Sequence, residues 1–359
     1  MSPVQEERPV MQRSPVRLVR KNRIADKVVI VNGLPGCGKT LVAPIVGALA
    51  RMEVMHFDYQ LEHACQLRYL NAIDDDAAIS LVRTYTDLDL YHLTMSREVN
   101  FRPGDVSSVF KNARPMRYLK RFFLPEGEEA VKRIQREKPI LLLVTHVLVG
   151  IEGPILAALG DAVRIMEVIR HPLYMIKQTY TWMPRAGVDP RVFSLCFEYR
   201  GHSLPYYAKG WEEKFLGSNR MDRTIYALED MWRRMEQAVE RLNPDQQKLI
   251  MKVPFEEYVL RPEPIMKRLE LFLGTECVPE TRRMMKKHHV PRKMIADGIG
   301  LPIYKVYGWR PPRRGATEAD ELRDRRAFAA REATPEALAV LDRYSAEYEE
   351  KYMKGILSR

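Results

Sequence analysis

The sequence contains few cysteines, and their positions exclude a disulfide framework. Only four occur among 359 residues, and no two of them form a CxxC pair. A small secreted domain that depends on disulfides would instead show an even set of closely spaced cysteines. The chain is therefore expected to fold in a reducing compartment, and we predict a cytoplasmic location.

Long hydrophobic runs are also missing. No apolar stretch approaches the roughly 18 residues that a membrane-spanning helix needs, so no membrane span is expected. The start of the chain is rich in Pro, Arg and Glu and lacks the apolar core of a secretory signal. We interpret residues 1–24 as a basic flexible tail. The whole chain is 46% hydrophobic and 29% charged, which is typical of a soluble globular protein.

Metal-binding and nucleic-acid-binding patterns are absent as well. None of the eight histidines stands in a ligand pattern with cysteines or carboxylates, so no metal site is predicted. Basic residues are not interleaved with stacking aromatics, so nucleic acid is not an expected partner. The net charge of +11 then indicates an anionic ligand, an acidic polymer such as a sulfated glycan, or only a well-solvated surface.

The sequence does contain a phosphate-binding loop. It fits G-x-x-x-x-G-K-[ST] at every fixed position, between the apolar run 28–31 and a helical-looking stretch, 41–51. Glycines let the backbone wrap around an anion, and the N–H groups at the helix start point at it. Kinases, hydrolases, GTP switches and sulfuryl-transfer enzymes all use such a loop, so it does not choose a reaction. Its residues are Gly33, Leu34, Pro35, Gly36, Cys37, Gly38, Lys39 and Thr40.

Predicted strands and helices alternate along the chain. This alternation implies an α/β fold, in which a parallel sheet has helices on both faces. We expect the sheet in a domain of residues 25–310, followed by a helical C-terminal extension, 311–359. The predicted strands are 28–31, 53–57, 139–144, 163–169 and 249–253, and the predicted helices include 76–98, 127–136, 154–159, 173–182, 221–242, 264–273, 317–331 and 334–354.

Arg170 directly follows the predicted strand 163–169 and opens a helix with His171 and Pro172. Ligands bind at the carboxyl ends of strands in open α/β sheets, so Arg170 is expected on the sheet edge that carries the glycine loop. Its guanidinium could hold a second phosphate group bidentately. It could equally be a helix-start arginine paired with a carboxylate.

His146 follows Thr145 at the end of the predicted strand 139–144. A histidine at this edge is well placed as a general base that removes a proton from an attacking hydroxyl. A structural hydrogen-bond role is the alternative.

Taken in order, these features resemble the sulfotransferases that use 3′-phosphoadenosine-5′-phosphosulfate. In that family a 5′-phosphosulfate loop follows the first strand, and a later segment reads strand, Thr-His, strand, Arg-x-Pro, helix. An aromatic-Glu-acidic run, a proline and a helix that closes in Phe-Leu-Gly come near the end. The resemblance covers residues 26–310. The late segment here is Phe255, Glu256, Glu257 and Tyr258, then Pro262 and Pro264, then Phe272, Leu273 and Gly274.

The resemblance implies a P-loop sulfotransferase-like fold and roles for individual residues. His146 would be the catalytic base, and Lys39 would stabilise charge on the departing phosphate. Arg170 would bind the 3′-phosphate of the donor. Gln178 stands where the family usually has Ser, with Thr179 beside it, and either could donate a hydrogen bond. The 5′-phosphosulfate would be bound by Gly36, Cys37, Gly38, Lys39 and Thr40.

One departure keeps a second reaction open. The family commonly carries Lys or Arg where this chain has Gly36, and Lys39 stands where nucleotide kinases place their lysine. The alternative is an ATP- and magnesium-dependent small-molecule kinase, in which Asp58 would hold magnesium or act as a base. Against it, strand 139–144 runs into Thr145 rather than an acidic residue. Asp58 could also be an ordinary helix cap.

The sulfotransferase hypothesis leaves the acceptor open. The aromatic and basic segment 183–219 is expected to cover the site, which suits a carbohydrate and a small hydroxylated or aryl molecule equally. A non-catalytic nucleotide- or polyanion-binding protein is the third hypothesis.

Overall fold

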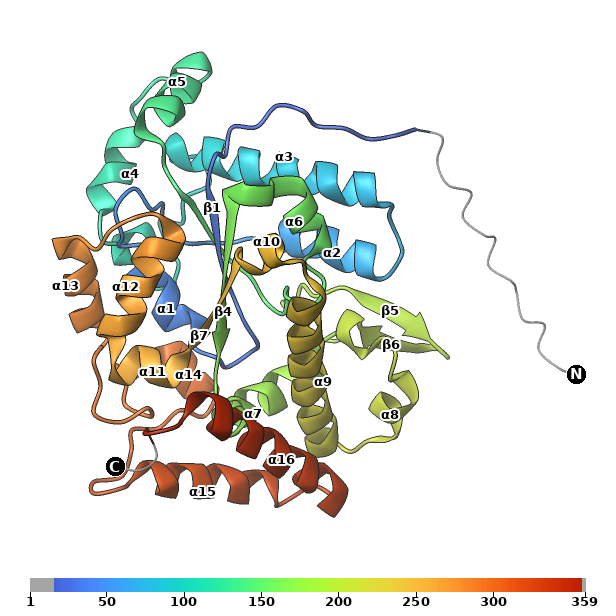
Figure 1. The fold of residues 1–359 in the computed structure, drawn as a ribbon. Coiled ribbons are helices and arrows are strands. Elements are labelled where there is room, and N and C mark those ends of the chain that lie inside the picture. Colours follow the sequence, from blue (N-terminus) through green and yellow to red (C-terminus); the bar gives the residue numbers. More distant parts are fainter. Residues whose placement is uncertain (1–15, 357–359) are drawn as a thin grey trace, which may run out of the picture.

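A five-stranded parallel sheet forms the centre of the molecule (Figure 1). The computed structural model describes residues 16–356, so residues 1–15 of the predicted tail lie outside the described part. The strand order is β2-β3-β1-β4-β7, and every neighbouring pair runs parallel. All five strands fall where the sequence predicts them. They are β1 (Val28–Asn32), β2 (His56–Phe57), β3 (Leu141–Val144), β4 (Val163–Ile169) and β7 (Ile250–Pro254).

The central strand explains why the sequence shows an unbroken apolar run there. β1 pairs with β3 on one side and β4 on the other, and all five of its residues are buried. A strand covered on both faces needs apolar side chains at every position rather than at alternate ones. The α/β class with a parallel sheet is confirmed.

Helices cover both faces of this sheet. α2, α3 and α6 pack together on one face, and α1 packs with α13 on the other (Figure 1). Among the helices between residues 16 and 356, none has the length and apolar character needed to span a bilayer. The helices are α1 (Lys39–Val46), α2 (Tyr59–Tyr69), α3 (Asp75–Thr94), α4 (Pro115–Arg121), α5 (Glu128–Glu137), α6 (Gly153–Leu159), α7 (Pro172–Trp182), α8 (Glu212–Gly217), α9 (Arg220–Arg241), α10 (Pro244–Gln247), α11 (Phe255–Leu260), α12 (Pro262–Leu273), α13 (Pro279–Lys287), α14 (Pro302–Val306), α15 (Glu318–Ala329) and α16 (Pro335–Tyr352).

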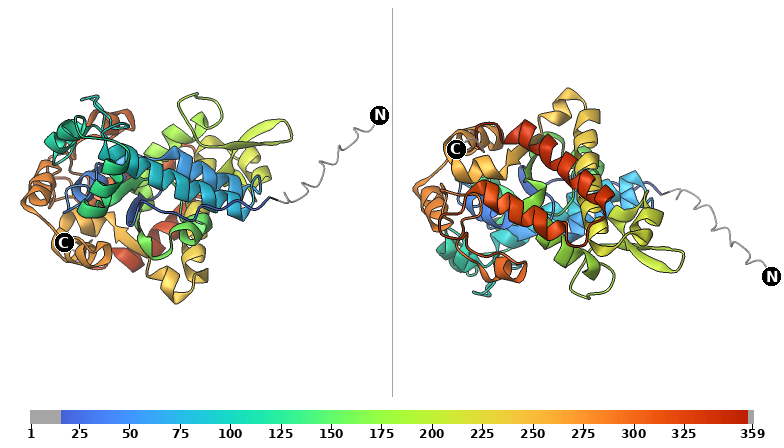
Figure 2. Two further views of the ribbon diagram at one scale, coloured as in Figure 1. Left: turned by 90° about the horizontal axis from the view of Figure 1, so that it is seen from above. Right: turned by 90° about the horizontal axis from the view of Figure 1, so that it is seen from below.

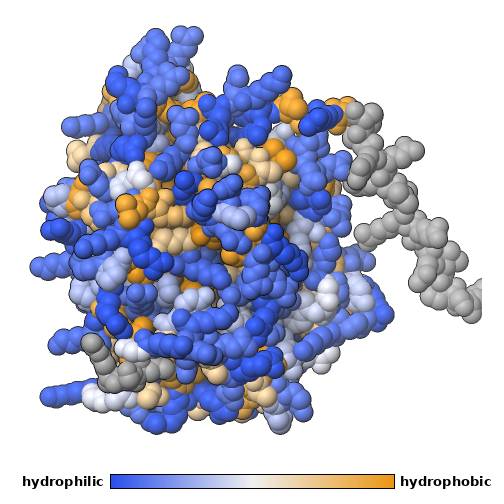
Figure 3. Space-filling view, viewed as in Figure 1, coloured by the Kyte–Doolittle hydropathy of each residue, from blue (hydrophilic) through white to orange (hydrophobic). Residues whose placement is uncertain are grey.

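The last two helices pack onto the body of the molecule. α15 lies against α7, and α16 lies against both α7 and α9 (Figure 2). Trp232 of α9 stacks on Tyr344 of α16, with ring centroids 4.4 Å apart. The predicted C-terminal helices are thus present, and they bury aromatic side chains against the α/β part. Hydrophilic side chains cover most of the face seen in Figure 3, with apolar ones scattered between them.

Several elements were not expected from the sequence, among them α4, α8 and α10. α2 was not among the predicted helices either, although Asp58 was a candidate helix cap, and Oδ1 of Asp58 does accept the backbone N–H of Leu61 at 2.9 Å. An antiparallel hairpin, β5 (Cys196–Tyr199) and β6 (His202–Pro205), was also not expected. Its two-residue turn has positive φ at both positions, which is the usual geometry of such hairpins.

The N-terminal segment is held against α3, where Leu18 already donates its backbone N–H to Asp76. Arg20 pairs with Asp87 at 2.5 Å, and the backbone N–H groups of Ile24 and Ala25 donate to the other oxygen of the same carboxylate. Asp87 therefore fixes the point at which the chain enters β1.

Candidate active site

The glycine loop between β1 and α1 closes tightly because its glycines adopt conformations that other residues avoid. Gly33 has φ +146° and Gly38 has φ +104°. A Cβ at Gly33 would lie 2.3 Å from the carbonyl oxygen of Val168, and one at Gly38 would lie 2.3 Å from the ring of Phe255. The loop thus packs directly against β4 and α11, with no room for side chains at these two positions.

Lys39 is the only basic residue of the loop, and its ammonium group is folded over it. The Nζ donates to the carbonyl oxygens of Gly33 and Leu34, the latter at 3.3 Å. The residue is 6% exposed, yet it lines the cavity described below. These contacts hold the ammonium group of Lys39 beside the backbone of the loop.

Arg170 lies beside the loop at the end of β4, as predicted. Its Nη1 donates to the carbonyl oxygen of Gly36 at 3.0 Å. The guanidinium stacks between two rings, 4.1 Å from the centroid of Phe255 and 4.7 Å from that of Tyr174. Burial lowers the pKa of Arg170 below its ordinary value, although nearby Glu256 opposes the shift. Its Nε–H is buried and has no hydrogen-bond partner within the described residues, 16–356.

His146 lies at the end of β3 and is oriented by a carboxylate. Its Nδ1 donates to Oε1 of Glu62 at 3.0 Å, and the same oxygen accepts the backbone N–H of His146 at 3.0 Å. The imidazole stacks between Phe57 and Tyr59, at centroid distances of 6.1 and 5.9 Å. With Nδ1 engaged by the carboxylate, Nε2 is the nitrogen left to accept a proton.

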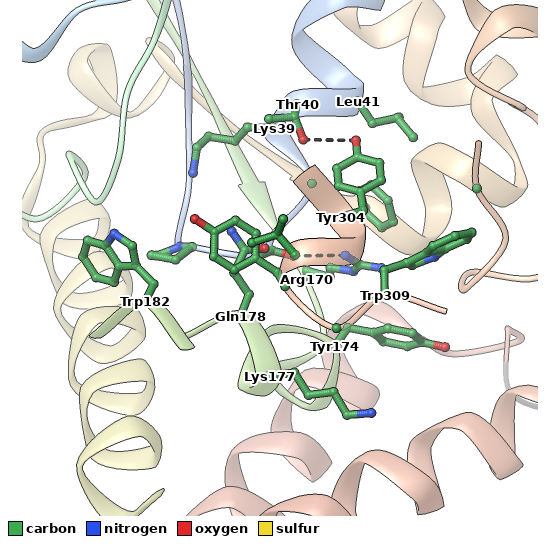
Figure 4. Close-up of a pocket in the computed structure, with 18 of the residues that line it drawn as sticks. Lys39, Thr40, Leu41, Arg170, Tyr174, Lys177, Gln178, Trp182, Tyr304 and Trp309 are labelled. Carbon is green, nitrogen blue, oxygen red and sulfur yellow. Dashed lines mark hydrogen bonds between the residues drawn. The ribbon is translucent and has the colours of Figure 1, made fainter. Parts of the chain in front are cut away.

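One cavity of about 490 Å³ joins these groups (Figure 4). Within the cavity, Tyr304 points toward the loop, and its hydroxyl lies 3.1 Å from the hydroxyl of Thr40. The structure therefore brings the predicted loop, general base and second cation to one concavity at the carboxyl edge of the sheet. Lining residues include Gly36, Gly38, Lys39, Thr40, His146, Arg170 and Gln178.

Two predicted contacts have a different environment. The thiol of Cys37 is buried 3.8 Å from Nζ of Lys39, and Cys37 is not among the lining residues. Burial raises the pKa of this thiol, which keeps it protonated. Thr179, the alternative to Gln178, bonds its hydroxyl to the carbonyl of Met175 at 3.1 Å and is fully buried. Gln178 is the one of this pair that lines the cavity.

The strand ends beneath the loop form a buried polar network that the sequence did not reveal. Asn32 donates to Glu167 at 2.5 Å and accepts the hydroxyl of Thr145 at 2.9 Å. Burial raises the pKa of Glu167 to about 7, although Asn32 and Lys39 oppose the shift. This network ties the ends of β1, β3 and β4 together below the cavity.

Asp58, the candidate magnesium ligand of the kinase alternative, is not at the cavity. Its Oδ1 caps α2. Its carboxyl group is buried next to that of Asp89 from α3. Burial, and secondly the neighbouring Asp58, raise the pKa of Asp89 to about 9. Within residues 16–356, no three His, Cys, Asp or Glu side chains are grouped as metal ligands. The structure thus does not favour the kinase alternative.

The segment expected to cover the site contributes only its first part. Arg185, Asp189, Arg191 and Val192 line the cavity. The aromatic run further along does not, because Tyr207 is fully buried in the core. Residues that the sequence did not single out, Glu62 and Tyr304 among them, come from segments without a recognisable pattern.

No protein-family model matches the chain, and no curated protein matches it. The sulfotransferase domain of the Synechococcus olefin synthase aligns with 89% of this chain and 98% of its own length, at 13% identity and a TM-score of 0.38. The sulfotransferase domain of the curacin biosynthetic pathway aligns with 85% of this chain and 97% of its own, at 10% identity and a TM-score of 0.40. A Mycobacterium avium sulfotransferase aligns with 91% of this chain and 77% of its own, at 14% identity and a TM-score of 0.39. At these identities the alignments do not identify the residues that carry the chemistry.

Proposed function

We propose that the chain is a sulfotransferase, which moves a sulfuryl group from 3′-phosphoadenosine-5′-phosphosulfate to a hydroxyl or amine acceptor. The observation that carries the proposal is that one cavity holds two separate cationic sites and a carboxylate-oriented histidine. The glycine loop with Lys39 is the first site, and the Arg170 guanidinium is the second. A nucleotide with phosphate groups at both its 3′ and 5′ positions requires two such sites.

The donor set fits that nucleotide. Arg170 presents a buried Nε–H without a partner, and a phosphate oxygen would supply the missing acceptor. Gln178 lines the same cavity and can donate from its amide. When bound, the donor supplies the sulfuryl group, whose transfer leaves adenosine 3′,5′-bisphosphate.

The residues of the chain perform two tasks in this reaction. His146 removes the acceptor proton at Nε2, and Glu62 stabilises the imidazolium as it forms. Lys39 and the loop N–H groups stabilise the negative charge that grows on the departing phosphate, because they are fixed beside it before the reaction begins. Phe57 and Tyr59 hold the imidazole plane between them and line the acceptor end of the cavity.

Calorimetric titration tests the proposal directly. Adenosine 3′,5′-bisphosphate and ATP, each with and without magnesium, are titrated into the full chain. We expect tight binding of the bisphosphate that does not depend on magnesium, and Arg170→Ala should weaken it selectively. Binding of ATP that requires magnesium, without any response to the bisphosphate, would overturn the proposal.

Turnover tests the role of the histidine. His146→Ala should abolish sulfuryl transfer while the bisphosphate affinity stays within about twofold, because the contacts of His146 are with Glu62, Phe57 and Tyr59 rather than with the loop or Arg170. An active His146→Ala variant would show that another group removes the proton.

A further inference from the structure

One of the arginines that line the cavity comes from the C-terminal helices. Arg325 of α15 stacks on the ring of Tyr174, with its guanidinium carbon 4.3 Å from the ring centroid. Arg170 stacks on the same ring at 4.7 Å. Both arginines and the tyrosine line the cavity. Two guanidinium groups from distant parts of the chain therefore share one aromatic ring beside the candidate nucleotide site.

Both arginines keep a buried hydrogen-bond donor without an acceptor in the part of the chain that the structure describes. Arg325 pairs with Glu321 at 3.2 Å from its Nη2, but its Nε–H has no partner among residues 16–356. The same holds for the Nε–H of Arg170, although Glu256 lies near its guanidinium. Buried donors normally find acceptors, and two neighbouring cations repel each other. Both arginines thus offer a donor and a positive charge to an anion in the cavity that they line.

The C-terminal helices are fixed firmly enough to position Arg325. The hydroxyl of Tyr174 donates to Glu318 in the first turn of α15 at 2.6 Å. On α16, Glu349 lies 3.0 Å from Nε2 of His171, and Tyr348 donates to Glu256 at 2.6 Å. These contacts attach both helices to the turn that carries Arg170.

We propose that Arg325 binds, together with Arg170, the phosphate group of the nucleotide that lies away from the glycine loop. The C-terminal helices are then part of the donor site and help to select nucleotides that carry a second phosphomonoester. This inference rests on the proposed function, because it assumes a nucleotide phosphorylated at two positions.

The experiment compares two ligands on four proteins by calorimetric titration. The ligands are adenosine 3′,5′-bisphosphate and adenosine 5′-monophosphate, and the proteins are the unmodified chain, R325Q, R325K and R323Q. We expect R325Q to weaken the bisphosphate roughly tenfold to a hundredfold, the range for a lost charged hydrogen bond. The monophosphate should change by less than about threefold. R325K, which keeps the charge without the planar fork, should fall between.

Arg323 is the matched control, because it lies on the same helix, is exposed and pairs with Asp320 only. R323Q should leave both affinities unchanged. Thermal unfolding of each variant shows whether it is still folded. If R325Q is unfolded, the affinities of R325K for the two ligands are compared with those of the unmodified chain instead. A purely structural role of Arg325 would weaken both ligands equally.

The outcomes separate the two proposals. An unmodified chain that binds the bisphosphate selectively, with R325Q and R325K within about twofold of it, would overturn the role of Arg325 alone. Equal loss for both ligands would also overturn it. An unmodified chain that does not distinguish the bisphosphate from the monophosphate would overturn the proposed function and the role of Arg325 with it.

Discussion

Gly38→Ala tests the packing that joins the glycine loop to the second cationic site. An alanine there must keep φ near +104°, and its Cβ would lie 2.3 Å from Cε2 and 2.4 Å from Cδ2 of Phe255. The backbone conformation costs roughly 1–2 kcal/mol for a residue with a Cβ. Displacing a packed ring adds roughly 1–3 kcal/mol. We expect G38A to lower the free energy of unfolding by about 2–5 kcal/mol, the sum of these two costs.

Urea unfolding of a double-mutant cycle separates the two costs. Phe255→Leu shortens the side chain that the new methyl group meets, but it does not relieve the backbone conformation. The double variant G38A/F255L should therefore be more stable than the sum of the single changes predicts, by about 1–3 kcal/mol. Additivity within about 0.5 kcal/mol would refute the reasoning, because the methyl group and the ring would then not be in conflict.

The same change should affect binding, because the Arg170 guanidinium stacks on Phe255 at 4.1 Å. Moving the ring moves the platform that positions the guanidinium. G38A should thus weaken the bisphosphate more than F255L does at equal folded fraction, because it disturbs the loop as well as the ring. Equal weakening would indicate that G38A acts through the ring alone.

Three further changes test the site and its support. Glu62→Gln keeps the shape but removes the charge beside His146, so turnover in steady-state assays should fall roughly tenfold to a hundredfold; unchanged turnover would contradict the role of Glu62. Tyr348→Phe removes a buried donor to Glu256 at 2.6 Å, so urea unfolding should show a loss of about 1.5–3 kcal/mol; no loss would mean that water replaces the hydroxyl. The pKa of Asp89 is about 9 in the folded chain, against an ordinary value of 3.8. Between these two pH values Asp89 is protonated in the folded state and ionised in the unfolded state, so the folded state loses stability as the pH rises. Asp89→Asn should therefore gain stability relative to the unmodified chain between pH 5.5 and 8, by at most about 1.4 kcal/mol per pH unit, and a difference that does not change with pH would contradict this assignment.

The sheet was predictable because its strands are buried on both faces. In the run Val28–Asn32 the first four residues are apolar and all five are buried, as expected of a strand that is covered on both faces. α2 was not predictable, because its buried face contains Glu62 and Gln66 alongside Leu61. Buried polar residues interrupt the apolar period from which a helix is recognised.

The candidate site was predictable only where the strands end. Arg170 and His146 follow strands directly, and the carboxyl ends of parallel strands meet at one edge. Glu62 and Arg325 lie within helices, where charged residues usually face solvent. Only the three-dimensional packing of α2 and α15 shows that these two side chains point inward.

The structure also gives a physical reason for Gly36, where the family that the sequence resembles commonly carries a basic residue. Gly36 has φ +90°, and a Cβ there would lie 3.1 Å from Cα of Met175, a backbone atom of α7 that cannot move aside cheaply. A lysine or arginine would thus require a different loop. The positive charge comes from two other places: Lys39 folds over the loop from its C-terminal side, and Arg170 donates to the carbonyl of Gly36 itself at 3.0 Å. A cation from the end of β4 therefore stands beside the position at which the loop itself cannot carry a basic side chain.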